Sequence, residues 1–246
     1  MRKLLTTILL LAVAPLVVAA EAGHKLMNAD VDLGDKASLQ RGAKMFMNYC
    51  VGCHSAGYMR YNRISQDLGI PEDVMKTSLM FTTDKIGEPI VSAMKPADSE
   101  AWFGVTPPDL SVIARSRGTD WLYSFLNGFY VDPKTKTGVN NLYFAGTAMP
   151  HVLWELEGMK RAVFKSETSQ DGTTAEVFER FEQQSPGLMK EHEYRRATRD
   201  LVAYLDYMGE PAKLVRYALG AKVIFFLMIF FVAAYLLKRE YWKDVH

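Results

Sequence analysis

The chain has 246 residues, of which 49% are hydrophobic and 23% are charged, and its formal net charge is +1. Residues 21–212 contain 21 Lys and Arg against 26 Asp and Glu, a formal charge of −5. This mildly acidic segment favours a basic protein partner and argues against nucleic acid as a ligand. The chain has two cysteines, Cys50 and Cys53, which excludes a disulfide framework and a four-cysteine zinc site.

The N-terminus has the pattern of a secretory signal. Two basic residues precede a short apolar stretch over residues 4–18, and two alanines follow it. A basic start, a short apolar segment and a small-residue site are typical of a signal peptide. We therefore expect residues 1–20 to be removed, with cleavage after Ala22 as the alternative, and the rest of the chain to be exported.

The first helix of the exported part is expected over residues 36–49, with Asp35 as its N-cap. Its apolar positions recur at helical spacing and therefore share one face. They are Leu39, Gly42, Ala43, Phe46 and Met47.

The run Cys50-Val-Gly-Cys53-His54 follows this helix and is the most informative feature of the sequence. It is the C-x-x-C-H pattern by which a c-type haem is attached. The spacing brings both thiols to the two vinyl groups of a porphyrin and directs the His54 imidazole at the iron. A thioredoxin-like pair would not need the histidine, and a structural zinc site would need further ligands. We therefore expect one covalently attached haem c.

The middle of the chain is predicted to be rich in loops. A helix is expected over residues 120–129, with Thr119 as its cap and its aromatic side chains facing inward. Residues 161–180 alternate around an Asp171-Gly172 turn and therefore predict a β-hairpin.

An iron held by one histidine needs a second axial ligand, and a methionine thioether is typical of an electron carrier. Met149 is the best candidate among the 13 methionines, because it lies in a loop of small residues and Pro150 restrains the backbone beside it. Met94 is the second candidate. His151 would instead give a bis-histidine haem, although a polar surface role is its simpler interpretation.

Another helix is expected over residues 193–208 and is stopped or turned by Pro211. The small Gly42 would let the first helix cross this one closely, against Tyr204 or Tyr207. Terminal helices that cross beside a covalent haem are the core of a class I cytochrome c fold.

The C-terminal segment has the length and composition of a membrane span. Residues 217–237 contain one charge, Lys222, and at ~1.5 Å per residue they match a hydrocarbon core of ~30 Å. Basic residues flank both ends, so the expected signal peptide decides the orientation. The sequence predicts a haem domain over 21–212 on the periplasmic side and an anchor with a cytoplasmic tail over 213–246, in the inner (cell) membrane.

Several motifs together resemble the cytochrome c1 family, the haem subunits of cytochrome bc1 complexes. Besides the attachment site and the single anchor, they are Tyr58-Met-Arg60-Tyr61, Thr106-Pro-Pro-Asp109-Leu-Ser111, Ala148-Met149-Pro150, and the run from Asp200 through Tyr204 to Gly209-Glu-Pro211. The resemblance covers most of the chain and is far more specific than C-x-x-C-H alone.

This resemblance implies a role for each site residue. Cys50 and Cys53 would hold the haem, His54 would be the proximal iron ligand and Met149 the distal one. Pro108 would pack at the His54 side, and Arg117 would pair with a propionate, a task that suits its permanent charge and forked geometry. Trp121 stands where the family often has another aromatic residue.

The implied function is an electron relay from a Rieske iron–sulfur protein to a cytochrome c, in a respiratory quinol–cytochrome c reductase that also contains cytochrome b. The chain would lie in membrane lipid through its anchor and supply no bond-making catalytic residues. The fold class expected is mainly α, a class I cytochrome c-like haem domain with loop insertions and a small β-hairpin, plus one C-terminal transmembrane helix.

Two alternatives lead to different functions. The chain could be the haem c subunit of another membrane complex, such as a terminal oxidase. A haem enzyme or gas sensor with an open iron site would require that Met149 does not bind the iron.

Overall fold

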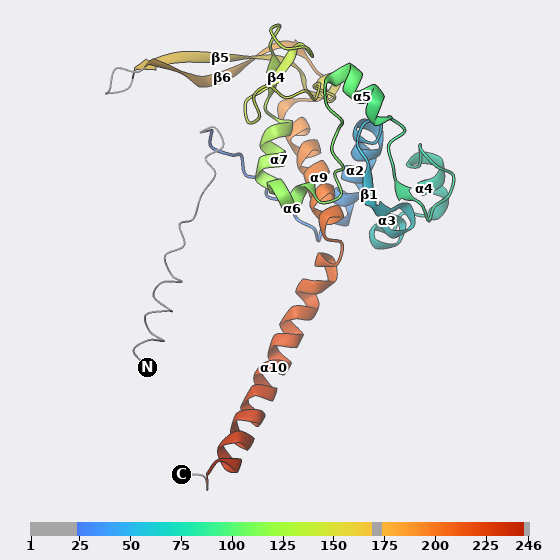
Figure 1. Ribbon diagram of the computed structural model, residues 1–246, viewed down its shortest axis with the longest axis vertical. Helices are drawn as coiled ribbons and strands as arrows, with labels where there is room; N and C mark the ends of the chain where they lie inside the picture. Colours follow the sequence, from blue (N-terminus) through green and yellow to red (C-terminus); the bar gives the residue numbers. More distant parts are fainter. Residues whose placement is uncertain (1–23, 169–173, 244–246) are drawn as a thin grey trace.

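The structure, a computed structural model, describes residues 24–168 and 174–243 (Figure 1). The expected signal peptide, residues 1–20, lies outside the described part. In chain order the elements are α2 (Lys36–Met45), a π-helical turn η1 (Phe46–Cys50), β1 (Ala56–Arg60), α3 (Tyr61–Leu68), α4 (Glu72–Ser78), β2 (Pro89–Ile90), α5 (Pro96–Phe103), α6 (Ile113–Arg117), α7 (Thr119–Leu126), β3 (Phe129–Val131), β4 (Val139–Asn141), α8 (Trp154–Glu157), β5 (Gly158–Thr168), β6 (Thr174–Pro186), α9 (Glu191–Gly209) and α10 (Lys213–Tyr241).

Helices α2 and α9 cross at the centre of the domain, as the sequence predicts. A Cβ added at Gly42 would lie 2.1 Å from the backbone oxygen of Asp200 and 2.7 Å from Cβ of Tyr204. Next to this point, the rings of Phe46 and Tyr204 pack with their centroids 5.6 Å apart. The missing side chain at Gly42 therefore allows the close crossing.

Polar contacts fix the start of α2 and tie it to α9. The carboxylate of Asp35 accepts the backbone N–H of Ser38 at 3.0 Å, which confirms the predicted N-cap. The hydroxyl of Ser38 donates to Asp200 at 2.5 Å, and Arg41 forms an ion pair with the same carboxylate at 2.6 Å. The buried Asp200 is thus satisfied from two positions of the neighbouring helix.

The helix predicted over 120–129 is wrong at both ends. Helix α7 begins at Thr119, so Gly118, with φ of +85°, takes the capping position that was expected for Thr119. It ends at Leu126, and the carbonyl of Tyr123 in its last turn accepts both the backbone N–H of Asn127 at 3.1 Å and the Asn127 side chain at 2.8 Å. Phe129 begins strand β3, which pairs with β4.

In the described part of the chain, the strands form three antiparallel two-stranded sheets. The largest consists of β5 and β6 and projects from the domain as an arm (Figure 1). The hairpin predicted over 161–180 is confirmed and is longer than expected at both strands, while its predicted turn at residues 171–172 lies outside the described residues.

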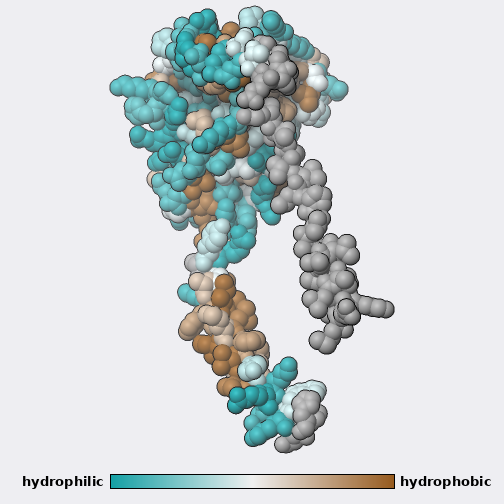
Figure 2. Space-filling view, turned by 90° about the vertical axis from the view of Figure 1, so that its left-hand side faces the viewer, coloured by the Kyte–Doolittle hydropathy of each residue, from teal (hydrophilic) through white to brown (hydrophobic). Residues whose placement is uncertain are grey.

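Helix α10 leaves the domain at the end of α9 and projects away from it (Figure 1). Among the residues that the structure describes, it contains the one stretch long and apolar enough to span a membrane, Leu219–Tyr241, with a mean hydropathy of 2.3. Figure 2 shows this hydrophobic surface followed by a hydrophilic end. The fold class expected from the sequence, a mainly helical domain with small sheets and one C-terminal apolar helix, is confirmed.

Candidate haem-binding site

The haem attachment motif begins where the first helix ends in a π-helical turn. The widened turn η1 ends at Cys50, whose carbonyl oxygen accepts the N–H groups of Cys53 at 3.0 Å and of His54 at 2.8 Å. These bonds fold the motif into one tight turn. Both cysteines are half-buried.

The environment of the thiols differs from that of a redox-active pair. Burial raises the pKa of Cys50 to about 12, and it also raises the pKa of Cys53. Redox-active cysteines have lowered pKa values, since the thiolate is the reactive species. The two sulfurs are therefore held as neutral, weakly polar groups at neutral pH.

The imidazole of His54 is oriented by the backbone of the Pro108 loop. Its Nδ1 lies 2.8 Å from the carbonyl oxygen of Pro108. Because a carbonyl only accepts, Nδ1 carries the proton and Nε2 keeps its lone pair for a metal. Burial also lowers the pKa of His54, which favours the neutral form that binds iron.

The Pro108 loop is itself fastened to the segment that follows the motif. The N–H of Leu110 donates to the carbonyl of Ser55 at 2.8 Å. The N–H of Gly57 donates to Asp109 at 2.8 Å, and that of Tyr58 to the hydroxyl of Ser111 at 3.0 Å. This ladder explains why the Thr106–Ser111 motif accompanies the attachment site in the sequence.

An aromatic wall surrounds Arg117. Its guanidinium lies 4.9 Å from the ring centroid of Trp121 and 5.9 Å from that of Phe144. Trp121 stacks on Phe125 with centroids 5.2 Å apart. Arg117 and Trp121, both singled out in the sequence analysis, thus lie together. Phe144, from the segment that leads to Met149, lies beside them. Pairing of Arg117 with a propionate stays a prediction.

Met149 is half-buried in a loop that polar side chains hold from its upstream end. Its N–H donates to the hydroxyl of Thr147 at 3.3 Å, and the N–H of Gly146 donates to the side chain of Asn140 at 2.8 Å. Met94 is also half-buried, on the segment before α5. The assignment of Met149 as the second iron ligand, with Met94 as the alternative, stays a prediction.

The interpretation of His151 as a polar surface residue is wrong. The side chain is buried, its ring stacks on Phe129 with centroids 4.9 Å apart, and its Nε2 lies 2.9 Å from the carboxylate of Glu157. Glu157 in turn pairs with the buried Lys160 at 2.5 Å. Sequence reasoning missed this cluster, because isolated charges beside a strand carry no pattern that distinguishes a buried pair from a solvated one.

The residues around the motif fit a haem. Tyr204 is fully buried, and among the described residues its hydroxyl has no hydrogen-bond partner. Its ring packs on Phe46, the first residue of the turn that ends at Cys50, with the ring centroids 5.6 Å apart. Two thiols in one tight turn and an imidazole with a preset tautomer are the groups that attach a c-type haem and bind its iron.

Fold and site together define a protein of the cytochrome class, with one helix among the described residues that is long and apolar enough to span a membrane. The Cytochrome C1 family model matches residues 28–177 and 189–245. The chain is similar to cytochrome c1 of Allochromatium vinosum, with 45% identity over 246 residues covering all of both chains. It is also 44% identical over 247 residues, again covering all of both chains, to a protein of Nitrosomonas europaea named ammonia monooxygenase gamma subunit. Cytochrome b/c1 of Bradyrhizobium diazoefficiens is 25% identical over 86% of this chain and 34% of that protein.

The chain therefore belongs to the cytochrome c1 family. It is an electron-transfer haem subunit of a bc1 complex, anchored in the membrane. The expectation drawn from the attachment motif and its accompanying segments is confirmed at this level, and the alternative of a terminal oxidase subunit is not favoured.

Proposed function

We propose that this chain carries one haem c, joined by thioethers to Cys50 and Cys53, with His54 and Met149 as the axial ligands. The observation that carries the proposal is the Cys50–His54 turn. There the carbonyl oxygen of Pro108 lies 2.8 Å from Nδ1 of His54 and so fixes the tautomer of the ligand histidine. Arg117 would neutralise a propionate. Haem, when bound, supplies one-electron redox chemistry, and a thioether ligand gives it the high potential of an electron carrier.

The chain would relay electrons from a Rieske iron–sulfur protein to a cytochrome c. The formal charge of −5 on residues 21–212 suits a basic electron acceptor, because opposite charges steer the two proteins together. The residues of the chain position the redox group and limit its access to water, while the bonds of the substrates stay intact in this subunit.

The proposed topology has residues 1–20 as a cleaved signal and residues 21–212 as the periplasmic haem domain, with 213–246 as anchor and short cytoplasmic tail in the inner (cell) membrane. Helix α10 would lie in membrane lipid beside cytochrome b. The name of the Bradyrhizobium relative, cytochrome b/c1, supports that neighbour. The Nitrosomonas relative is instead named as a subunit of a monooxygenase. The proteins that copurify with this chain therefore distinguish a cytochrome b neighbour from a monooxygenase neighbour.

Replacing each candidate methionine by leucine tests the axial ligand. In the complex purified through this chain, Met149→Leu should lower the midpoint potential of the c-type haem and allow the ferrous haem to bind carbon monoxide. Met94→Leu is the matched control and should change neither. An unchanged Met149→Leu spectrum would contradict the assignment and favour an open or differently ligated iron, and an effect of Met94→Leu instead would move the role to that residue.

A further inference from the structure

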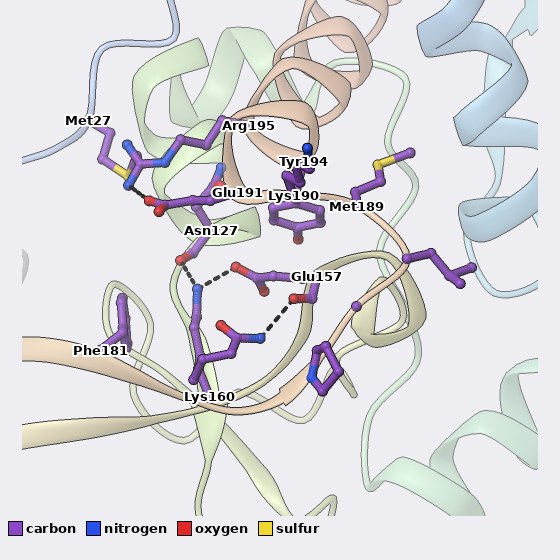
Figure 3. Close-up of a pocket in the computed structure, with 14 residues that line it drawn as sticks. Met27, Asn127, Glu157, Lys160, Phe181, Met189, Lys190, Glu191, Tyr194 and Arg195 are labelled. Atoms are coloured by element: carbon purple, nitrogen blue, oxygen red, sulfur yellow. Dashed lines mark hydrogen bonds and ion pairs between the residues drawn. The ribbon is translucent and has the colours of Figure 1, made fainter.

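A buried charged cluster lies at the foot of the projecting hairpin, outside the residues assigned so far. The ammonium of Lys160 donates to Glu157 at 2.5 Å and to the backbone carbonyl of Asn127 at 2.7 Å, and it lies 4.3 Å from the ring centroid of Phe181. Figure 3 shows these groups converging on one point beside a pocket. The side chains of Lys160 and Glu157 are only 9% and 10% exposed.

Such a pair is costly to place in a protein interior. Burial opposes the charge on Lys160 and lowers its pKa, although the adjacent Glu157 acts in the opposite direction. A buried ion pair commonly stabilises a fold no better than apolar residues of similar size, so its presence suggests a role in fixing one particular arrangement. The groups that the cluster contacts therefore indicate what it fixes.

The second carboxylate oxygen of Glu157 points to the loop of Met149. It lies 2.9 Å from Nε2 of His151, the residue two positions after Met149, in a close polar contact that lacks the alignment of a hydrogen bond. One face of the same imidazole stacks on the ring of Phe129 at an interplanar angle of 8°. The side chain of His151 is thus held between a charge and an aromatic ring that belong to two different elements.

The backbone between Met149 and the cluster is short and hydrogen-bonded. The N–H of Val152 donates to the carbonyl of Pro150 at 2.9 Å, and that of Trp154 to the carbonyl of His151 at 3.2 Å. Glu157 closes the same turn, since its N–H donates to the carbonyl of Leu153 at 3.0 Å. These turns join His151 and Glu157 to Met149 through a short hydrogen-bonded segment.

We propose that His151, Glu157 and Lys160 form a brace that positions the Met149 loop so that the thioether stays on the iron. The brace holds the downstream end of the loop, while Thr147 and Asn140 hold the upstream end. These three are positioning residues, and none of them touches the iron in this account. The inference rests on the proposed ligation by Met149.

The test is Lys160→Met in the complete complex, which removes the charge and keeps the length of the side chain. We expect a lowered midpoint potential and a fraction of ferrous c-type haem that binds carbon monoxide at least about tenfold larger than in the wild type, a factor that corresponds to ~1.4 kcal/mol. Arg161→Met is the matched control. This variant removes the ion pair between Arg161 and Glu182 on the exposed side of the same hairpin. It should change neither the midpoint potential nor the carbon monoxide response.

Two further variants separate the possible outcomes. Glu157→Gln preserves the shape of the side chain and should produce the same change to a smaller degree, even if Lys160→Met does not assemble. If Met149→Leu alters the potential and the carbon monoxide response but Lys160→Met and Glu157→Gln do not, the brace is refuted and the ligation stands. If Met149→Leu also changes nothing, the ligation itself fails and the brace with it.

Discussion

The crossing of α2 and α9 gives a quantitative prediction for Gly42→Ala. The added Cβ would lie 2.1 Å from the carbonyl oxygen of Asp200, whereas nonbonded heavy atoms pack at about 3.5 Å. A backbone oxygen cannot rotate away, so the helices must separate by roughly 1 Å, which also loosens the contact of Phe46 with Tyr204. Because the clash is with backbone, we take the upper end of the overpacking cost, ~3 kcal/mol; alanine regains about 1 kcal/mol of helix propensity, so we expect a net loss of about 2 kcal/mol.

The assay is thermal unfolding of the detergent-solubilised full chain with its haem, followed by circular dichroism. For a domain of this size, a loss of about 2 kcal/mol lowers Tm by roughly 4–8 °C. The control is Gly87→Ala, since nothing lies within 4 Å of a Cβ added at Gly87, and its Tm should stay close to that of the wild type. A Gly42→Ala protein that melts within about 1 °C of the wild type would refute the reasoning.

Two further predictions concern the β3–β4 region and the anchor. Hydrogen bonds from the Asn140 side chain and the Lys134 N–H hold the pKa of Asp132 below its usual value, so its stabilising effect is present above the unfolded pKa of ~3.9 and is lost as pH falls through the folded pKa. Asp132→Asn should therefore lower Tm at pH 7, and the difference from the wild type should disappear in acid; a difference that persists there would show that the charge is not responsible. Phe230→Arg, near the middle of the apolar stretch Leu219–Tyr241, should weaken membrane insertion by ~3–4 kcal/mol, the unfavourable contribution of Arg plus the favourable one lost with Phe. Extraction at alkaline pH should then release this variant but not Trp242→Arg at the end of the helix, and equal retention of both would contradict the role of α10 as anchor.

The sequence was most informative where local patterns decide the structure. Asp35 caps its helix because a cap depends on a few residues at fixed spacing. The apolar run of α10 was equally clear, since a span needs only length and composition. The attachment motif identified the cofactor because its chemistry requires that spacing.

The parts that failed depend on contacts between distant segments. The side chain of Asn127, just beyond the end of α7, donates to Thr198 of α9 at 3.1 Å, and no periodicity reveals such a partner. Likewise, the burial of His151 follows from Phe129 and Glu157 enclosing it. Contacts between distant segments are therefore needed to place the residues after α7 and to bury His151, and the local sequence does not show them.

The central claim is that this chain is the haem-bearing electron relay of a bc1 complex with a closed iron site. The most direct test is a reduced-minus-oxidised optical spectrum, with and without carbon monoxide, of the complex gently solubilised and purified through this chain. The account predicts a c-type band that carbon monoxide does not shift, together with b-type haem bands. A c-type band without b-type haem, or one shifted by carbon monoxide, would contradict it.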